Sequence, residues 1–236
     1  MNRLLASLIF ASCCWCGNAP GIGNSNLVIG GGSGGAAADL ISEDCEGAGT
    51  PSGWTSDAGS PNWDDTTSPS PLVGAQSLSL GTANTTAIKA SLGNKTEVWG
   101  YFQIRFVGSV PNGVLFFELR SSADSPAFQM DTVGSTPRIN DGATAITVTA
   151  FSADTTYHCW IHYKQVAGAN NDIIDFKFST TATEPADGSN GHAQVTAGVN
   201  DFTIDKFVPE SQFGTVRIVF DKLRLSDIGD IGSNPL

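Results

Sequence analysis

The chain has 236 residues, of which 15% are charged, and its 12 basic and 23 acidic side chains give a formal net charge of −11. This length suits one domain with a tail, and so few charged residues beside 27 Gly and 11 Pro argue against a helical bundle. An acidic chain gains nothing from counterion release at phosphate backbones, so we expect no nucleic-acid partner. Beyond the N-terminus, no apolar run is long enough to span a membrane.

The N-terminal segment at residues 1–16 places one positive charge, Arg3, before a short apolar run. The run is too short to cross a bilayer, and this design is typical of an export signal. The residues around Cys13 are similar to a bacterial lipobox, which would make Cys13 a lipid anchor, although Phe10 stands where such boxes usually carry Leu. The alternative is an uncleaved apolar peptide that docks in an assembly.

Residues 17–38 are rich in Gly and other small residues. This composition predicts a flexible linker that cannot pack a core. We expect the linker to lead into one domain over residues 39–227, followed by a short C-terminal tail at 228–236.

The chain has five cysteines, Cys13, Cys14, Cys16, Cys45 and Cys159. The first three have no His nearby and no second Cys pair at zinc-finger spacing, so we expect no metal site there. If the leader is removed, two cysteines remain in an exported chain. They form either a disulfide or two separate buried thiols.

Apolar and polar residues alternate through the domain, and turn residues such as Pro111-Asn112-Gly113 separate the alternating runs. Short strands with turn signals between them, and no helical periodicity, predict an all-β, antiparallel two-sheet β-sandwich of the jelly-roll kind. The expected strands cover residues 98–106, 114–120, 127–131, 146–151, 157–165, 173–179, 202–208 and 216–225.

Alternation also predicts which side chains of these strands face the core. If Phe102, Ile104, Phe106, Cys159, Ile161 and Tyr163 face inward, the opposite surface is aromatic and polar. We expect it to carry Trp99, Tyr101, Gln103, Arg105, Glu118, Arg120, His158, Trp160 and His162. Flat rings beside planar hydrogen-bonding groups suit a sugar, which stacks its C–H face and pairs its hydroxyls. The alternative is a solvated or loop-covered surface of cross-strand pairs.

Three segments resemble known domains of this architecture. They are Glu43–Gly47 with Pro51–Trp54, then Thr155–Tyr163, and finally Val216–Leu225. Together they resemble the first strand and loop, the central strand and the last strand of concanavalin A-like lectin/glucanase domains, the laminin-G-like jelly rolls. The resemblance implies the fold over residues 39–227, but this sandwich serves binding proteins and enzymes alike.

The same resemblance implies a structural calcium, because related jelly rolls hold Ca²⁺ with oxygen ligands where the first and last strands meet. Its ligands would be Glu46 and Asp221. We expect no other cofactor to be required.

The residues give little support to catalysis. A glycanase needs carboxylates two and four positions apart on one strand, and Glu43, Asp44 and Glu46 come nearest but lie at the opening strand. Glu118 and Arg120 resemble part of a polysaccharide-lyase pattern, but no Gln-x-His and no matching late Tyr accompany them. We therefore expect no enzyme.

The sequence favours a non-catalytic, lectin-like glycan-binding module, extracellular or displayed on a cell or virion surface. One alternative is a viral structural or decoration protein that uses the sandwich and the Gly-rich arm for particle assembly. Another is a secreted polysaccharide lyase or glycanase. The expected partners are a polysaccharide or glycan and further copies of the chain, or other virion or surface subunits, since weak sugar sites gain from multivalency and viral proteins assemble by symmetry.

Overall fold

A computed structural model describes residues 39–67, 72–140, 145–147, 149–168, 171–198, 201–212, 215–229 and 231. The chain divides into two units, Met1–Ala36 and Ala37–Leu236, and only the second contains described residues. The predicted leader at 1–16, the linker at 17–38 and most of the tail lie outside the described residues. No residue of the linker itself is described, and the description begins at Asp39.

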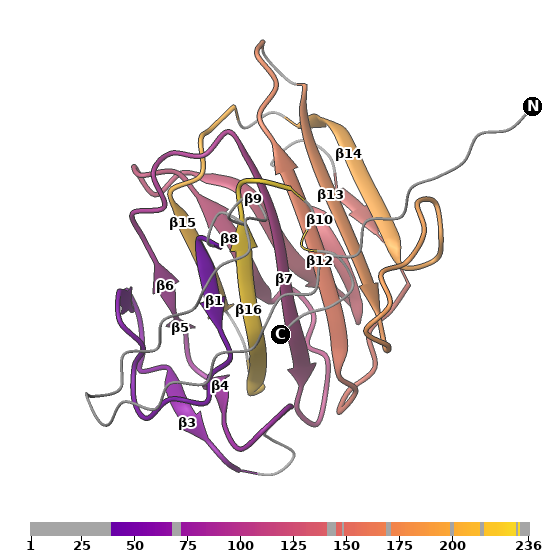
Figure 1. Cartoon of the computed structure of the whole chain (residues 1–236). Coiled ribbons are helices and arrows are strands. Elements are labelled where there is room, and N and C mark those ends of the chain that lie inside the picture. The colour runs from indigo at the N-terminus through magenta and orange to yellow at the C-terminus, as the bar shows by residue number, and fades with distance from the viewer. Residues whose placement is uncertain are drawn as a thin grey trace, which may run out of the picture. The chain divides into compact units, whose positions relative to one another are not determined.

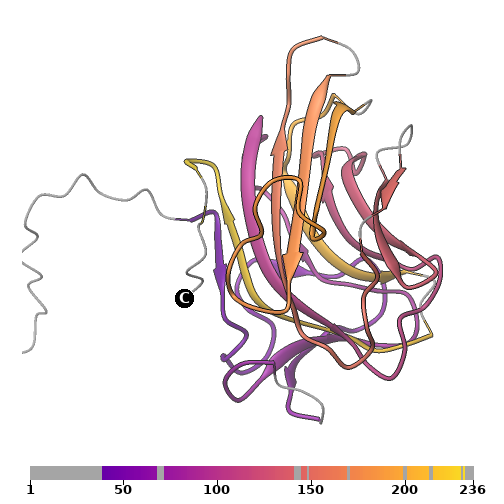
Figure 2. The same cartoon turned by 90° about the vertical axis from the view of Figure 1, so that its right-hand side faces the viewer.

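The second unit is an antiparallel β-sandwich of two sheets, as the alternation predicts (Figures 1 and 2). Sheet A has the strand order β14 (His192–Gly198), β13 (Asp172–Ser179), β12 (Tyr157–Lys164), β7 (Glu97–Phe106), β16 (Ile218–Ser226), β4 (Ser77–Leu80) and β3 (Asn62–Asp65). A further strand of this sheet, β1 (Ile41–Glu43), pairs with β16 outside that order. The described residues contain no helix, and so none that is long and apolar enough to cross a membrane.

Sheet B lies against the inner face of sheet A, as the two layers in Figure 2 show. Its strand order is β11 (Ala145–Thr147), β10 (Thr136–Asn140), β9 (Pro126–Val133), β8 (Leu115–Arg120), β15 (Lys206–Gln212), β6 (Ile88–Lys89), β2 (Trp54–Thr55), and β5 (Thr85–Thr86) also pairs with β15. An aromatic core joins the two sheets. Phe102 of β7 stacks on Phe117 of β8 with ring centroids 4.9 Å apart, and Phe117 meets Phe207 of β15 edge-on.

The predicted inward face of β7 and β12 is confirmed. Phe102, Ile104 and Phe106 of β7 are completely buried in the core, together with every second residue of β12 from Tyr157 to Tyr163. Gly100 interrupts the apolar run of β7 because it sits directly opposite Ile161. A Cβ at Gly100 would lie 2.5 Å from Ile161 Cγ1, so the Ile side chain occupies the space that any larger residue would need.

The last strand, β16, departs from simple alternation. Its pairing with β7 shifts register between Asp221 and Arg224, and Lys222 takes a positive φ of 51° at that point. Such a bulge adds one residue to a strand and so exchanges its two faces. Phe220 and Leu223 therefore both reach the core although they are three positions apart.

Most predicted strands are confirmed within a few residues, and two are displaced. The strand expected over 202–208 is β15 at Lys206–Gln212, and the one expected over 146–151 is β11 at Ala145–Thr147. Eight further strands, β1–β6, β10 and β14, were not assigned individually. Several are only two to four residues long, which is too short for alternation to stand out.

The two described cysteines are separate buried thiols, so the disulfide alternative is wrong. Cys159 is completely buried in the core on β12, and Cys45 is 1% exposed beside β1. Burial raises the pKa of both thiols far above its ordinary value. Neither thiol is therefore a nucleophile in the folded chain.

Candidate functional site

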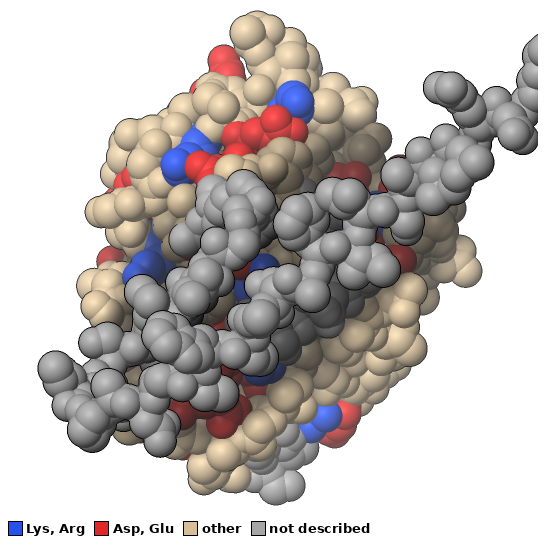
Figure 3. Space-filling view, viewed as in Figure 1, with Lys and Arg blue, Asp and Glu red and all other residues tan. Residues whose placement is uncertain are grey.

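Six of the nine predicted glycan-binding residues come together on the outer face of sheet A. The antiparallel register of β7 and β12 makes them direct cross-strand neighbours, in the pairs Trp99–His162, Tyr101–Trp160 and Gln103–His158. Side chains opposite one another across two strands share a face and lie within contact distance. Figure 3 is viewed from this side; where described atoms are visible, acidic and basic side chains are scattered among uncharged ones.

Trp99 and His162 form the partly exposed end of this row. Their rings are parallel within 8°, with centroids 4.8 Å apart. His162 Nε2 lies 2.9 Å from Glu97 Oε1, and Lys164 donates to the same carboxylate. Burial alone would raise the pKa of Glu97, but the hydrogen bonds from His162 and Lys164 bring it below its ordinary value. Glu97 thus holds the edge of the His162 imidazole, and the flat face of that imidazole packs against the Trp99 indole.

Tyr101, His158 and Gln103 form a buried hydrogen-bonded group further along the row. Tyr101 Oη lies 2.6 Å from His158 Nδ1, and Gln103 Nε2 donates to the same hydroxyl oxygen over 3.3 Å. Burial raises the pKa of Tyr101 to about 12 and lowers that of His158. Both groups are therefore neutral near pH 7, and the phenol proton is directed at Nδ1. The group resists ionisation, which suits positioning better than proton transfer.

Trp160 lies on the predicted face but is not the open platform that the sequence suggests. It is 4% exposed, with its ring edge-on to Tyr101 at 5.5 Å and stacked at 6.2 Å from His158. Tyr101 and Gln103 are also buried. Alternation identifies the face on which a side chain lies, but large rings on neighbouring strands cover one another. These three residues therefore lie on the predicted face, but they are buried there.

A hollow of about 120 Å³ opens beside the Trp99–His162 pair. It is bounded by β7, β12, β13 and the segment that joins β13 to β14. Its lining residues are Trp99, Gly100, Trp160, Ile161, His162, Asp175, Lys177 and Glu184. Aromatic rings and charged hydrogen-bonding groups thus meet around one concave space. This is the arrangement expected of a small-ligand site.

The sequence analysis missed three polar residues of this hollow. Asp175 and Lys177 are outward-facing residues of β13, alternating with the core residues Ile174 and Phe176. The alternation of the predicted strand 173–179 already indicates that the side chains of Asp175 and Lys177 face outward. Glu184 lies in the segment after β13, and no pattern in the sequence indicates that it returns to the strand.

Lys177 attaches that segment to the sheet. Its Nζ lies 2.8 Å from Glu184 Oε1 and 2.7 Å from Asp187 Oδ1. Burial alone would lower the pKa of Lys177, but these two carboxylates raise it above its ordinary value. The hydrogen bond from Lys177 in turn lowers the pKa of Asp187. The Lys177 ammonium group therefore holds the segment between β13 and β14 at two residues, Glu184 and Asp187.

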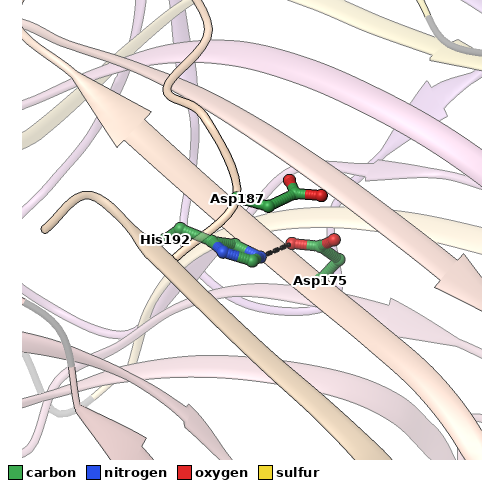
Figure 4. Close-up of side chains that lie close together, drawn as sticks. All are labelled: Asp175, Asp187 and His192. Atoms are coloured by element: carbon green, nitrogen blue, oxygen red, sulfur yellow. Dashed lines mark ion pairs between the residues drawn. The ribbon is translucent and has the colours of Figure 1, made fainter. Parts of the chain in front are cut away.

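His192 ties the end of the same segment to Asp175, as Figure 4 shows. His192 Nε2 lies 2.8 Å from Asp175 Oδ1, while Nδ1 accepts a 2.6 Å hydrogen bond from the backbone N–H of Gly188. Nε2 and Asp175 Oδ1 are both buried, and despite their short separation the geometry of their contact is not that of a hydrogen bond.

Asp175, Asp187 and His192 bring possible ligand atoms within 4.8 Å of one another. Two of these ligand groups are already engaged, because His192 Nδ1 accepts from the Gly188 backbone and Asp187 is paired with the Lys177 ammonium group. The three side chains therefore connect β13, β14 and the segment between them.

Glu118 and Arg120 do not join this site, contrary to the sequence analysis. They lie on β8 of sheet B, whereas the aromatic row lies on sheet A. There Arg120 contacts Glu118, and its Nη2 lies 3.3 Å from Glu210 Oε2. Asp57 approaches Arg120 Nη1 to 3.6 Å. Alternation predicts that a residue faces outward but not from which of the two sheets, and this caused the error.

Arg105 lies on the outer face of β7 but is engaged elsewhere. Its Nε and Nη2 donate to Thr156 Oγ1 over 3.1 Å and 2.7 Å, just before β12 begins. Arg105 does not line the hollow. Of the nine predicted residues, three line it directly: Trp99, Trp160 and His162.

The predicted calcium ligands, Glu46 and Asp221, are joined by one short segment. Asp221 accepts hydrogen bonds from the backbone N–H of Val73 and the hydroxyl of Ser77, and both carboxylate oxygens of Glu46 accept from the one backbone N–H of Ala75. These donors engage carboxylate oxygens that a calcium ion would also use. Burial raises the pKa of Asp221 to about 6. The calcium stays a prediction, and nothing below depends on it.

No family model matches the chain, and no curated protein does. Among solved structures, the cellulose-induced protein Cip1 is 14% identical over 81% of this chain and 99% of its own, with a TM-score of 0.58. A carbohydrate esterase from Shiga toxin-encoding bacteriophage phi24B is 12% identical over 80% and 97%, with a TM-score of 0.53. The likeness shows the fold alone.

The receptor binding domain of botulinum neurotoxin mosaic serotype C/D is a third similar structure. It is 6% identical, with a TM-score of 0.56, and the match covers 84% of this chain and 49% of the receptor binding domain. The same sandwich therefore occurs in proteins with different functions, so the function of this chain has to be argued from its own site.

Proposed function

We propose that this chain is a non-catalytic glycan-binding module of the concanavalin A-like jelly-roll kind, and that the hollow on sheet A is its binding site. The observation that carries the proposal is the parallel stack of Trp99 and His162 at the edge of that hollow. A sugar ring packs its C–H face on such a flat, pre-oriented indole with little loss of side-chain entropy.

The polar side chains of the hollow supply the second requirement for sugar binding. Asp175 and Glu184 offer carboxylate oxygens, and Lys177 offers N–H donors, within the same lining. Sugar hydroxyls both donate and accept, so they pair with groups of either kind. These residues are fixed by the salt bridges described above, and a pre-organised site loses less entropy on binding.

The similar structures agree with this proposal at the level of their names. One is called a cellulose-induced protein, and another a carbohydrate esterase of a bacteriophage. They support a role connected with carbohydrates and, with the predicted export signal, extracellular or surface display. Multivalent presentation by a homo-oligomer or by other surface subunits belongs to the same proposal.

A panel of immobilised glycans, probed with the full-length chain, tests this function. We expect saturable binding that is reduced at least about tenfold in Trp99→Ala, because each lost stacking contact is worth on the order of 1 kcal/mol or more. Val133→Ala, an exposed apolar residue on sheet B, serves as the control and should bind like the wild type. Absence of binding to every glycan, or unchanged binding by Trp99→Ala, would contradict the proposal.

The enzymatic alternative makes a different prediction. A polysaccharide lyase releases products with a new double bond, which absorb ultraviolet light, and a glycanase releases new reducing ends. We expect neither signal from any polymer that the chain binds. Turnover that is abolished in Glu118→Gln or Arg120→Ala would favour the enzyme instead.

A further inference from the structure

The charges around the hollow are unbalanced. The residues that line it, the partners of their ion pairs, and Lys164, which pairs with one of those partners, include four carboxylates and two ammonium groups. The carboxylates belong to Glu97, Asp175, Glu184 and Asp187, and the ammonium groups to Lys164 and Lys177. Carboxylates therefore outnumber ammonium groups two to one in this part of the described surface.

Lys177 is the only Lys or Arg among the lining residues, and it is already paired. Its ammonium lies within 2.8 Å of Glu184 and within 2.7 Å of Asp187, and its side chain is 16% exposed. A ligand carboxylate could reach this ammonium only by displacing one of these anions, and it would remain beside the other. Like charges at such distances, partly removed from water, repel strongly.

The described hollow thus has a carboxylate acceptor and no unpaired cation. Lys177 engages Glu184 Oε1, so Glu184 Oε2 can accept a hydrogen bond from a hydroxyl group, and more strongly from an ammonium group, whereas Asp175 Oδ2 already accepts from Gln194 Nε2. Neither side chain can accept from an ionised carboxylate or a sulfate, which have no proton to give.

We infer that this hollow binds sugar rings that are uncharged or carry an amino group, and that it excludes rings bearing a carboxylate or sulfate. The inference rests on the proposed glycan-binding function and deepens it by naming the ligand class. Because the rings of a uronate polymer carry carboxylates, the inference also weighs against the alternative that the chain is a polysaccharide lyase acting on such a polymer.

Calorimetric titration of the full-length chain at pH 7 and low salt tests the inference with named probes. Cellohexaose, xylohexaose and mannohexaose represent neutral chains, and chitosan hexamer represents amino sugars. Oligomers of alginate and of polygalacturonate represent acidic chains. We expect at least one neutral or amino probe to bind about tenfold or more tightly than either acidic probe.

One variant tests whether the carboxylates cause the exclusion. Asp187→Asn removes one anion from Lys177 without changing a residue that lines the hollow, so acidic oligomers should bind several-fold more tightly while neutral ones change little. Asp124→Asn is the matched control, because Asp124 forms a similar 2.6 Å pair with Lys206 on the far sheet. Asp124→Asn changes the net charge of the chain by the same amount as Asp187→Asn, and it should leave the affinity for acidic oligomers unchanged. Thermal unfolding would verify that each variant folds.

The possible outcomes distinguish the two proposals. Tighter binding of alginate or polygalacturonate oligomers than of every neutral and amino probe would overturn the inference and leave the glycan-binding function in place. Equal gains in Asp124→Asn and Asp187→Asn would also overturn it, because they would show a general charge effect. If no probe binds and the glycan panel is likewise negative, the proposed function fails and the inference fails with it.

Discussion

Trp99 and His162 are direct cross-strand partners whose rings are parallel within 8° at 4.8 Å. The imidazole edge is held in turn by Glu97, 2.9 Å from Nε2. Because one face of the indole is covered by His162, only its other face is free to meet a ligand. The orientation of the proposed sugar platform is therefore set by a residue that need not touch the sugar.

Replacing His162 tests this positioning role. His162→Ala should weaken glycan binding several-fold while lowering the free energy of unfolding by only about 0.5–1.5 kcal/mol, the usual contribution of an aromatic pair. His162→Phe should restore most of the affinity, because a second flat ring can support the indole. Titration calorimetry and denaturant unfolding measure the two effects. A loss of affinity that His162→Phe does not rescue would instead indicate direct contact between the imidazole and the ligand.

Lys177 should control the order of the wall that follows β13. Lys177→Gln leaves Glu184 and Asp187 without their cation, so we expect a loss of about 1–3 kcal/mol in stability. Backbone amides of residues 180–191 should exchange hydrogen faster, whereas those of β7 should not. Lys206→Gln removes a single pair, whose carboxylate on Asp124 is more exposed than that of Glu184, and should cost less than about 1 kcal/mol. Unchanged exchange in the wall would refute this role.

Glu210 should make the free energy of unfolding decrease as the pH rises. Burial first, and then the neighbouring charge of Glu118, raise the pKa of Glu210 from 4.5 to about 8, against the lowering effect of Arg120. Its Oε1 is buried without a hydrogen-bond partner among the described residues. Between the two pKa values the folded chain holds a proton that the unfolded chain has released. The free energy of unfolding therefore decreases with rising pH, by at most about 1.4 kcal/mol per pH unit for this group.

The variant Glu210→Gln carries no proton that it can lose, so its decline in stability between about pH 5 and pH 8 should be shallower than that of the wild type. Urea unfolding at several pH values measures the difference. Asp64→Asn replaces an exposed carboxylate and should keep the wild-type slope. If Glu210→Gln also keeps it, Glu210 is ionised in the folded chain and the prediction is wrong.

Gly100 should tolerate no side chain while Ile161 is present. Gly100→Ala places a methyl group 2.5 Å from Ile161 Cγ1, and overpacking of this kind costs about 1–3 kcal/mol. Gly47→Ala meets no atom within 4 Å and serves as the control. The double variant Gly100→Ala with Ile161→Ala should be more stable than the two single costs predict, because the second change creates the missing space. Strict additivity would contradict this explanation.

The sequence predicted the sandwich and the inner faces of its long strands, because alternation over eight to ten residues reports directly on burial. It did not predict the separation of Glu118 from Trp99, since two outward-facing runs look alike whether they belong to one sheet or two. The change of face within β16 also escapes alternation, because the bulge at Lys222 adds a residue to the strand.

The candidate site was predicted only in part, for related reasons. Trp99 and His162 were found because a strand's alternation puts them outward, and their pairing then follows from register. The burial of Trp160 depends on the rings beside it, which a single strand does not reveal. Glu184 enters the hollow only because the segment after β13 folds back onto Lys177, and that contact is set by tertiary structure.

The two buried thiols can report on transient local opening of the sandwich. Cys159 sits in the middle of a long central strand, and Cys45 sits beside a three-residue strand at the start of the described chain. A maleimide can alkylate either sulfur only in molecules where its surroundings have transiently opened. Mass-spectrometric timing of the two modifications would thus compare local opening near the first strand with local opening at a central strand, with no engineered cysteine.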